Sequence, residues 1–250
     1  MYGFLRRTHN ISGFKEIEIK ERDSKYGLAK SIISGVKEIL ERFDKIIVLE
    51  DDLYTSPYFL NYMNDALKCY QEQTELASIS GYSVPLKKID PNLYFLPGTF
   101  WWGWGTWKDR WELFNEDGAY LLKELKKRHM MKQYNINGSF LISPEIILKK
   151  LLKGKLSSWA VRWHASMVLE KKFSLYPSQS FVKNIGIGSG ENCRVKANCF
   201  NTQVAGKALE VDLLPVKVRP EIVKKIKKFY LKAHLILLCN LIKKIITGKN

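Results

Sequence analysis

The chain has 250 residues, and its 41 lysines and arginines exceed its 25 aspartates and glutamates, which gives a formal net charge of +16. Its 46% hydrophobic and 26% charged residues are typical of a globular protein and exclude a disordered chain. A chain of this length can bury a core without disulfides, and its four cysteines form no C-x-x-C pair, which argues against structural zinc. We find no apolar run long enough to span a membrane and no signal-peptide core, so we expect a cytoplasmic protein.

The positive charge is concentrated near the carboxyl end. Residues 217–250 hold ten lysines and arginines but only one acid, Glu221, so this segment carries +9 of the +16. The body of the chain is therefore only mildly basic. Such a charge favours a polyanionic partner, which could be an anionic membrane, a phosphorylated substrate or, as a minor alternative, nucleic acid.

Strand and helix patterns alternate in the first half of the chain. Residues 16–20 alternate in polarity like a strand, and residues 27–42 carry apolar side chains at helical spacing. The β-branched run at 45–49 predicts a buried parallel strand, the Ser-Pro pair at 56–57 predicts a helix start, and residues 76–80 predict another strand. This order favours an α/β fold with a mainly parallel sheet flanked by helices.

The second half of the chain is less regular. Residues 94–96 and 173–176 are short strand candidates. Helical patterns cover residues 107–115, 118–131, 144–152 and 160–171, and a basic amphipathic pattern begins at 217. We therefore divide the chain into a domain at 1–216 and a carboxyl-terminal helix at 217–250.

Three consecutive acids, Glu50, Asp51 and Asp52, directly follow the predicted strand at 45–49. Ligands of open α/β sheets bind at the carboxyl ends of strands. Mg²⁺ and Mn²⁺ prefer carboxylate oxygens and bridge to substrate phosphates, so this pattern predicts a metal–diphosphate site. The alternative is a solvated acidic turn before the helix that begins at Ser56.

Five of the seven tryptophans lie in the sequence WWGWGTWKDRW at 101–111. Aromatic faces stack on sugar rings and on bases, so the segment is a candidate sugar or nucleoside pocket. Trp102 and Trp104 are flanked by glycines and are the pocket candidates. Trp107 and Trp111 are expected in the core, where most tryptophan surface is buried.

A weaker pattern surrounds the start of the helix at 27–42. Arg22 follows the predicted strand at 16–20, Gly27 precedes the helix, and Lys30 lies in the same segment. The amino terminus of a helix attracts anions, so these residues are candidates for contacts with the phosphates of a nucleotide sugar. The alternative is a surface arginine beside an ordinary helix start.

Arg110 and His164 are further candidates for the sugar or acceptor site. Arg110 could pair with an acidic or phosphate group, and His164 could act as a general base or a metal ligand. A lone histidine is more often a structural residue. The sequence contains neither G-x-S-x-G nor H-E-x-x-H, which argues against those hydrolase sites.

Five segments in a fixed order resemble a group of bacterial glycosyltransferases with the A-type nucleotide-sugar fold. They are VLEDDLYTSPYFLNYMNDAL, SISGYSVP, WGWGTWKDRW, SWAVRW and YPSQSFVKNIGIGSG, and the resemblance covers residues 11–200. The acidic segment and its helix are more distantly similar to N-acetylglucosaminyltransferase I. The resemblance implies transfer of a hexosyl or N-acetylhexosaminyl group from a nucleotide-diphosphate sugar to a glycan or lipid-linked acceptor in surface polysaccharide synthesis, with Mn²⁺ or Mg²⁺.

The resemblance also implies roles for the acids. Asp52 matches the metal ligand, Asp51 is expected near the nucleotide ribose, and Glu50 belongs to the same nucleotide-sugar site. An inverting mechanism further needs a carboxylate base, which contributes about 10²–10⁴-fold.

The segment that would hold the catalytic base according to the resemblance contains no acid in this sequence. N-acetylglucosaminyltransferase I has the base in a Trp-Asp-Asp-Trp segment, whereas the matching residues 159–163 here read W-A-V-R-W. The candidates for this role are therefore Asp109, Glu112 and Glu191.

The relatives carry a further strand–helix–strand unit before the segment that corresponds to residue 11. We therefore expect a domain that lacks its first strand or strands. Because an unpaired sheet edge is exposed in such a domain, we expect it to bind nucleotide sugars poorly or to aggregate.

The carboxyl-terminal segment at 219–247 places Ile222, Ile226 and Ala233 on one helical face, with lysines elsewhere. Such a helix can lie in the interface of an anionic membrane, which would hold the protein peripherally on the inner face of the cell membrane. The alternative is a terminal helix packed on the domain.

Three functions are therefore compared. The first is a metal-dependent glycosyltransferase. The second is an inactive remnant or a basic protein that binds membrane or nucleic acid. The third is another metal-dependent phosphotransfer enzyme that uses Glu50 to Asp52.

Overall fold

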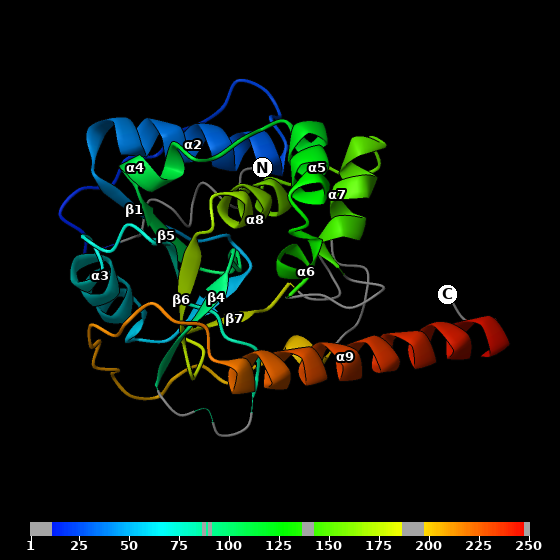
Figure 1. Ribbon diagram of the computed structural model, residues 1–250. Coiled ribbons are helices and arrows are strands. Elements are labelled where there is room, and N and C mark those ends of the chain that lie inside the picture. Colours follow the sequence, from blue (N-terminus) through cyan, green and yellow to red (C-terminus); the bar gives the residue numbers. More distant parts are fainter. Residues whose placement is uncertain (1–11, 87–88, 90–91, 137–142, 187–197, 248–250) are drawn as a thin grey trace.

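The structure, a computed structural model, describes residues 12–86, 89, 92–136, 143–186 and 198–247 (Figure 1). Its described helices are α2 (Leu28–Arg42), α3 (Phe59–Cys69), α4 (Lys108–Trp111), α5 (Gly118–Lys127), α6 (Met131–Tyr134), α7 (Pro144–Leu152), α8 (Ala160–Leu169), the 3-10 helix η1 (Asn198–Phe200) and α9 (Pro220–Thr247). Its described strands are β1 (Lys45–Val48), β2 (Leu53–Thr55), β3 (Leu76–Ser80), β4 (Leu93–Pro97), β5 (Trp104–Trp107), β6 (Phe173–Pro177) and β7 (Val182–Asn184). The chain thus has an α/β fold.

The main sheet has five strands in the order β1-β5-β3-β6-β4. Only β3 and β6 pair in parallel, whereas β1 with β5, β5 with β3, and β6 with β4 pair antiparallel. The prediction of a mainly parallel sheet is therefore wrong. Strands β1, β3 and β6 do share one direction, but β5 enters between β1 and β3 from the tryptophan-rich segment and runs the opposite way.

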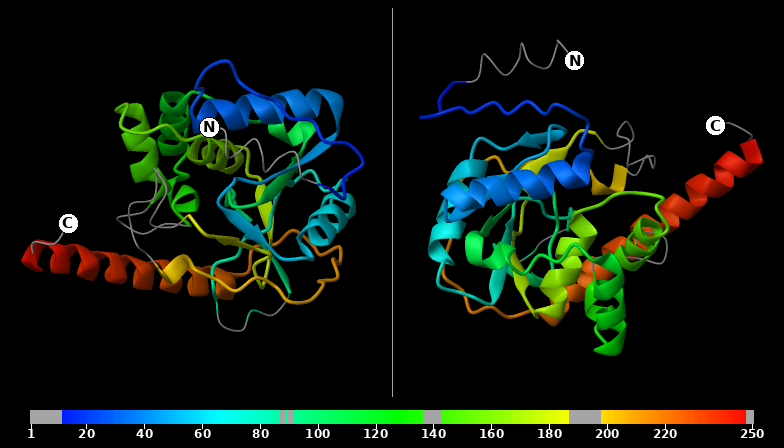
Figure 2. Two further views of the ribbon diagram at one scale, coloured as in Figure 1. Left: turned by 180° about the vertical axis from the view of Figure 1, so that it is seen from behind. Right: turned by 90° about the horizontal axis from the view of Figure 1, so that it is seen from above.

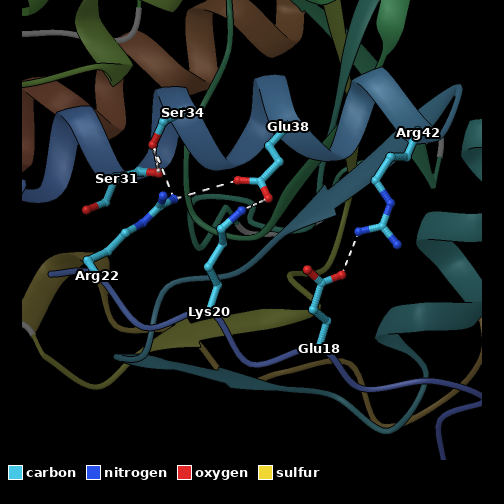
Figure 3. A network of polar contacts seen from close by, with 7 residues as sticks. All are labelled: Glu18, Lys20, Arg22, Ser31, Ser34, Glu38 and Arg42. Atoms are coloured by element: carbon cyan, nitrogen blue, oxygen red, sulfur yellow. Dashed lines mark hydrogen bonds and ion pairs between the residues drawn. The ribbon is translucent and has the colours of Figure 1, made fainter.

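The expected strand at 16–20 is also wrong. Residues 12–27 form no strand but lie extended along the outer side of α2 (Figure 3). Glu18 pairs with Arg42 at 2.5 Å, and Lys20 forms an ion pair with Glu38. The polarity alternates because every second side chain reaches the helix, while Ile17 and Ile19 remain exposed.

Helices α2 and α8 cover one face of the sheet. Apolar residues of α2 at helical spacing, Ala29, Ile33, Val36 and Leu40, join one buried cluster with four tryptophans, Trp104, Trp111, Trp159 and Trp163. Helices α5, α6 and α7 pack around α8 in a second cluster (Figure 1). The tryptophan-rich segment therefore supplies core to this face.

Helix α3 and the carboxyl-terminal part of the chain cover the other face. The Ser-Pro pair predicts a start at 56–57, and α3 proper begins two residues later, at Phe59. Ser56 nevertheless caps the turn that leads into the helix, because its hydroxyl accepts from Tyr58 N at 3.1 Å and donates to Ala205 O. Gly105 lets α3 approach β5, since a Cβ there would lie 3.0 Å from Met63 Cε. This close approach places the middle of α3 against the sheet.

Helix α9 begins at Pro220, close to the predicted start, and runs for 28 residues. Its first half packs on the domain, and its second half extends past the body (Figures 1 and 2). Within the described ranges, no helix is both long and apolar enough to cross a bilayer.

Candidate functional site

The predicted acidic segment lies at the carboxyl end of β1. Glu50, Asp51 and Asp52 turn the chain from β1 into β2, and Leu53 N donates to Glu50 O at 3.3 Å. Strand β2 pairs antiparallel with β7, with Leu53 opposite Asn184. This pairing brings a segment more than a hundred residues away against the acids.

Asp52 has one carboxylate oxygen fixed by the protein and one without a partner. Its Oδ2 accepts a hydrogen bond from Asn184 Nδ2 at 3.1 Å, and its carbonyl accepts one from Ile185 N at 2.8 Å. Gly186 approaches closely, since a Cβ there would lie 2.5 Å from Oδ2. Oδ1 is buried and has no hydrogen-bond partner among the described residues. A buried anionic oxygen without a donor is costly, and a bound cation would compensate for it.

Glu50 is half-buried beside Asp52. Burial is the main cause that raises the pKa of Glu50 to about 7, and the charge of Asp52 raises the pKa further. The indole of Trp159 donates a hydrogen bond to the carboxylate and partly opposes this rise in the pKa. The Glu50 carboxyl therefore titrates near neutral pH. The neighbouring Asp51 is exposed to solvent.

Residues 98–103, which we call the aromatic loop, lie at the same end of the sheet as the acidic segment. Trp104, the first residue of β5, pairs with Val48, the last residue of β1, so the loop before it adjoins the acidic segment. Half-buried Trp102 packs edge-on against Tyr82, with ring centroids 4.6 Å apart. Gly103 adopts a positive φ and accepts a hydrogen bond from Gly81 N at 2.6 Å.

Trp104 does not belong to a pocket, contrary to expectation. It is 0% exposed and stacks on Trp159 with centroids 5.0 Å apart. The pleat of β5 directs Trp104 and Trp107 to opposite faces of the sheet, and both join the core. The glycines beside Trp104 serve the close packing of backbone and helix rather than a ligand.

The structure places Asp109, Arg110 and Glu112 at the opposite end of the sheet. Trp107 pairs with Lys45, at the start of β1, and Lys108 N donates to Asp44 O at 2.8 Å. A four-residue strand is about 13 Å long, so these side chains lie far from Asp52. The structure therefore does not bring them together with the acidic segment as a base or a sugar ligand.

Arg110 is buried in a local structural role. Its guanidinium pairs with Asp109 at 2.5 Å, donates to Gln71 O at 2.5 Å and lies over the ring of Trp107. These contacts hold the chain between α3 and β3 to the end of β5. Glu112 is exposed nearby.

The two predicted phosphate ligands lie near the amino end of α2. Arg22 and Lys30 both lie over the ring of Tyr26, at 5.0 and 4.2 Å from its centroid. Arg22 also contacts Ser34 at 3.4 Å and Glu38 at 4.0 Å (Figure 3). Because two residues alone join α2 to β1, the helix runs back along the strand, and its amino end points toward the acidic segment. Arg22 and Lys30 therefore lie at the same end of the sheet as the acidic segment.

His164 is a core residue. Its Nδ1 accepts a hydrogen bond from Thr99 N at 2.9 Å, and its Nε2 donates to Tyr134 O at 2.8 Å. Burial lowers the pKa of His164 to about 4, so the ring is neutral at physiological pH. With both nitrogens used by the backbone, it has no atom left for a metal or a sugar.

Glu191, the third candidate base, lies outside the described residues. Two contributors to the site escaped the sequence reasoning, Asn184 and Trp159. Trp159 is the first residue of the W-A-V-R-W run at 159–163, and Asn184 is the last residue of β7. No local sequence pattern predicts the contact of Asn184 with Asp52 or that of Trp159 with Glu50, because each contact joins segments more than a hundred residues apart.

The described residues contain no group of three or more carboxylate, imidazole or thiol side chains able to hold a metal. Mg²⁺ commonly uses one or two carboxylates together with water and substrate phosphates. Asp52 Oδ1 fits that smaller donor set.

Comparison with known proteins adds no family. Neither the protein-family models nor the curated proteins include a match to this sequence.

Proposed function

We propose that the chain is a metal-dependent glycosyltransferase with the A-type fold, which moves a sugar from a nucleotide-diphosphate donor to a glycan or lipid-linked acceptor. The observation that carries the proposal is Asp52 at the carboxyl end of β1, whose buried Oδ1 lacks a partner in the part of the chain that the structure describes. The mixed α/β sheet, the adjoining aromatic loop and the cations near the start of α2 agree with it.

Each group has a definite part in the proposed reaction. Asp52 Oδ1 would hold Mn²⁺ or Mg²⁺ with the donor diphosphate, while Asn184 keeps the carboxylate oriented. The metal, when bound, neutralises the diphosphate as it leaves. The acceptor oxygen bonds to the anomeric carbon, the bond from that carbon to the diphosphate oxygen breaks, and the acceptor proton passes to a carboxylate.

Two of the three candidate bases are poorly placed for that last step. Asp109 and Glu112 lie at the opposite end of the sheet from Asp52. Glu191 is thus the candidate base that we retain from the sequence. Trp102, at the edge of the aromatic loop, is the retained sugar contact.

The decisive experiment measures binding of Mn²⁺ and uridine diphosphate by calorimetry. Asp52→Asn keeps the size of the side chain but removes its charge, and we expect an affinity loss of about tenfold or more. Asp109→Asn makes the same chemical change at the other end of the sheet and should leave binding unchanged. Equal binding by the two variants would contradict the proposal.

Analysis of the products separates this function from phosphotransfer. Incubation with Mn²⁺ and a uridine diphosphate sugar should release uridine diphosphate and free sugar, and the Asp52→Asn variant should not. Release of uridine monophosphate and sugar phosphate would mean attack at phosphorus and would assign the site to the other class of enzyme. A wild-type protein that binds neither metal nor nucleotide would favour the inactive or membrane-binding alternative.

A further inference from the structure

Helix α9 has two apolar faces. Ile222, Ile226, Tyr230 and Ala233 recur at helical spacing and are buried against the domain. Leu231, Leu235 and Leu238 also recur at helical spacing, but they are 58%, 52% and 40% exposed. At about 100° per residue, this second row lies on the side of the helix away from the domain. We call these three leucines the outer ridge.

Lysines surround the start of the outer ridge. Lys224, Lys227, Lys228 and Lys232 are all exposed, and none of the four forms an ion pair with another described residue. Lys224 and Lys228 precede Leu231 on the same side of the helix. The one acid of α9 is Glu221, in its first turn. The outward side is therefore cationic at its beginning and apolar farther along.

The inner side of α9 connects with the candidate site through aromatic rings. Phe229 contacts Phe200 with ring centroids 5.5 Å apart, and Phe200 contacts Trp102 at 6.5 Å. Tyr230 stacks with Phe100 at 6.4 Å. The helix is thus anchored on the aromatic loop, and its far half extends from the body (Figures 1 and 2).

We propose that α9 docks the protein on an anionic lipid surface, with the outer ridge entering the interface and the lysines contacting the headgroups. An exposed leucine row beside solvated lysines matches the two parts of such a surface, its acyl boundary and its negative charge. This inference concerns the outward side of α9 and makes no use of Asp52, so it stands whether or not the chain transfers sugars.

Other occupants fit the outer ridge less well. A second copy would bring two lysine-rich helices together, and like charges would repel. Nucleic acid would attract the lysines but would leave three leucines in water. A lipid surface satisfies both kinds of side chain.

Flotation of the full chain with vesicles tests the proposal. We compare phosphatidylcholine vesicles with vesicles that also contain phosphatidylglycerol, and we expect binding to the anionic vesicles that weakens as salt is added. The ridge variant changes Leu231, Leu235 and Leu238 to serine together. We expect it to bind at least about tenfold more weakly, because burial of each leucine in the interface is lost.

A matched control changes three exposed leucines elsewhere, Leu60→Ser, Leu152→Ser and Leu213→Ser, and should bind as the wild type does. Replacement of Lys224, Lys228 and Lys232 by glutamine should weaken binding on the order of 100-fold. Since all of these side chains are exposed, the variants should keep the wild-type circular dichroism.

Two results would overturn the inference. One is equal flotation of the ridge variant and the leucine control. The other is binding to DNA that depends on the lysines but not on the leucines, without flotation, which would assign the surface to nucleic acid.

Discussion

The two ends of the five-stranded sheet differ in how their charged groups are satisfied. At the end that holds Asp109 and Arg110, the guanidinium charge is compensated by a carboxylate, a carbonyl and an aromatic ring, although its Nε has no hydrogen-bond partner among the described residues. At the end that holds Asp52, a buried carboxylate oxygen has no donor from the described residues, and burial raises the pKa of Glu50 to about 7. Acidic residues and tryptophans occur at both ends of the sheet, so residue type alone does not tell the two ends apart. The charge left uncompensated is what distinguishes a candidate site from a structural ion pair.

The largest effect should come from the tryptophan that the sequence placed in a pocket. Trp104→Ala should lower the free energy of unfolding by about 3–5 kcal/mol, because it leaves a cavity between the sheet and α8. Trp102→Ala, at a half-buried position, should cost less. Urea denaturation of both variants measures the difference, and equal losses would show that the two rings are not differently buried.

His164 gives a prediction with a defined pH dependence. The pKa is about 4 in the folded state and about 6.5 in the unfolded state, so the unfolded chain binds the extra proton first. The stability contribution is complete above pH 6.5 and is lost as pH falls toward 4, by up to about 3 kcal/mol. His164→Asn should abolish this part of the pH dependence in denaturation at a series of pH values. An unchanged slope in the variant would refute the assignment.

Arg110 tests the structural end of the sheet. Arg110→Ala should lower the free energy of unfolding by about 1–3 kcal/mol, because the Gln71 carbonyl loses a charged donor. Binding of Mn²⁺ and uridine diphosphate should not change in the folded variant. A variant with wild-type stability but weakened nucleotide binding would move Arg110 back to the substrate site.

The smallest effect should come from the ion pairs along α2. Glu18→Gln should leave the urea midpoint unchanged, because the Glu18–Arg42 pair lies in solvent (Figure 3). The variant should instead be cut sooner by trypsin within residues 12–27, since this segment is held by side chains alone. A shifted midpoint would show that the segment contributes to global stability.

Sequence patterns predicted the regular parts of the fold well. The strands at 76–80 and 173–176 and the helix at 144–152 are confirmed, the last with Ser143 accepting from Ile146 N. A strand is also present at 45–48, but it pairs antiparallel with β5 and is only partly buried, so the prediction of a buried parallel strand there is wrong. Strand β5 was missed because both of its faces are buried, so it shows no alternation of polarity. The polarity of residues 16–20 alternates for another reason, because the charged side chains of Glu18 and Lys20 form ion pairs with α2.

The candidate site was predictable only in part. Asp52 follows from a hydrophobic run that leads into consecutive acids, which is a local pattern. Its partner Asn184 and the Trp159 contact of Glu50 depend on tertiary packing across more than a hundred residues. The sequence does not show that Asp109 and Glu112 lie at the other end of the sheet, which follows from the antiparallel pairing of β5 with β1.

The four residues of β5 also determine where the length of the chain can vary. Trp104 and Trp107 lie three positions apart, so each enters a different core, and Gly105 between them faces α3. A single inserted or deleted residue here would exchange the two faces and bring a side chain against α3. Homologues and engineered variants should therefore accept insertions in the exposed turn at 153–155, but keep the spacing of the two tryptophans constant.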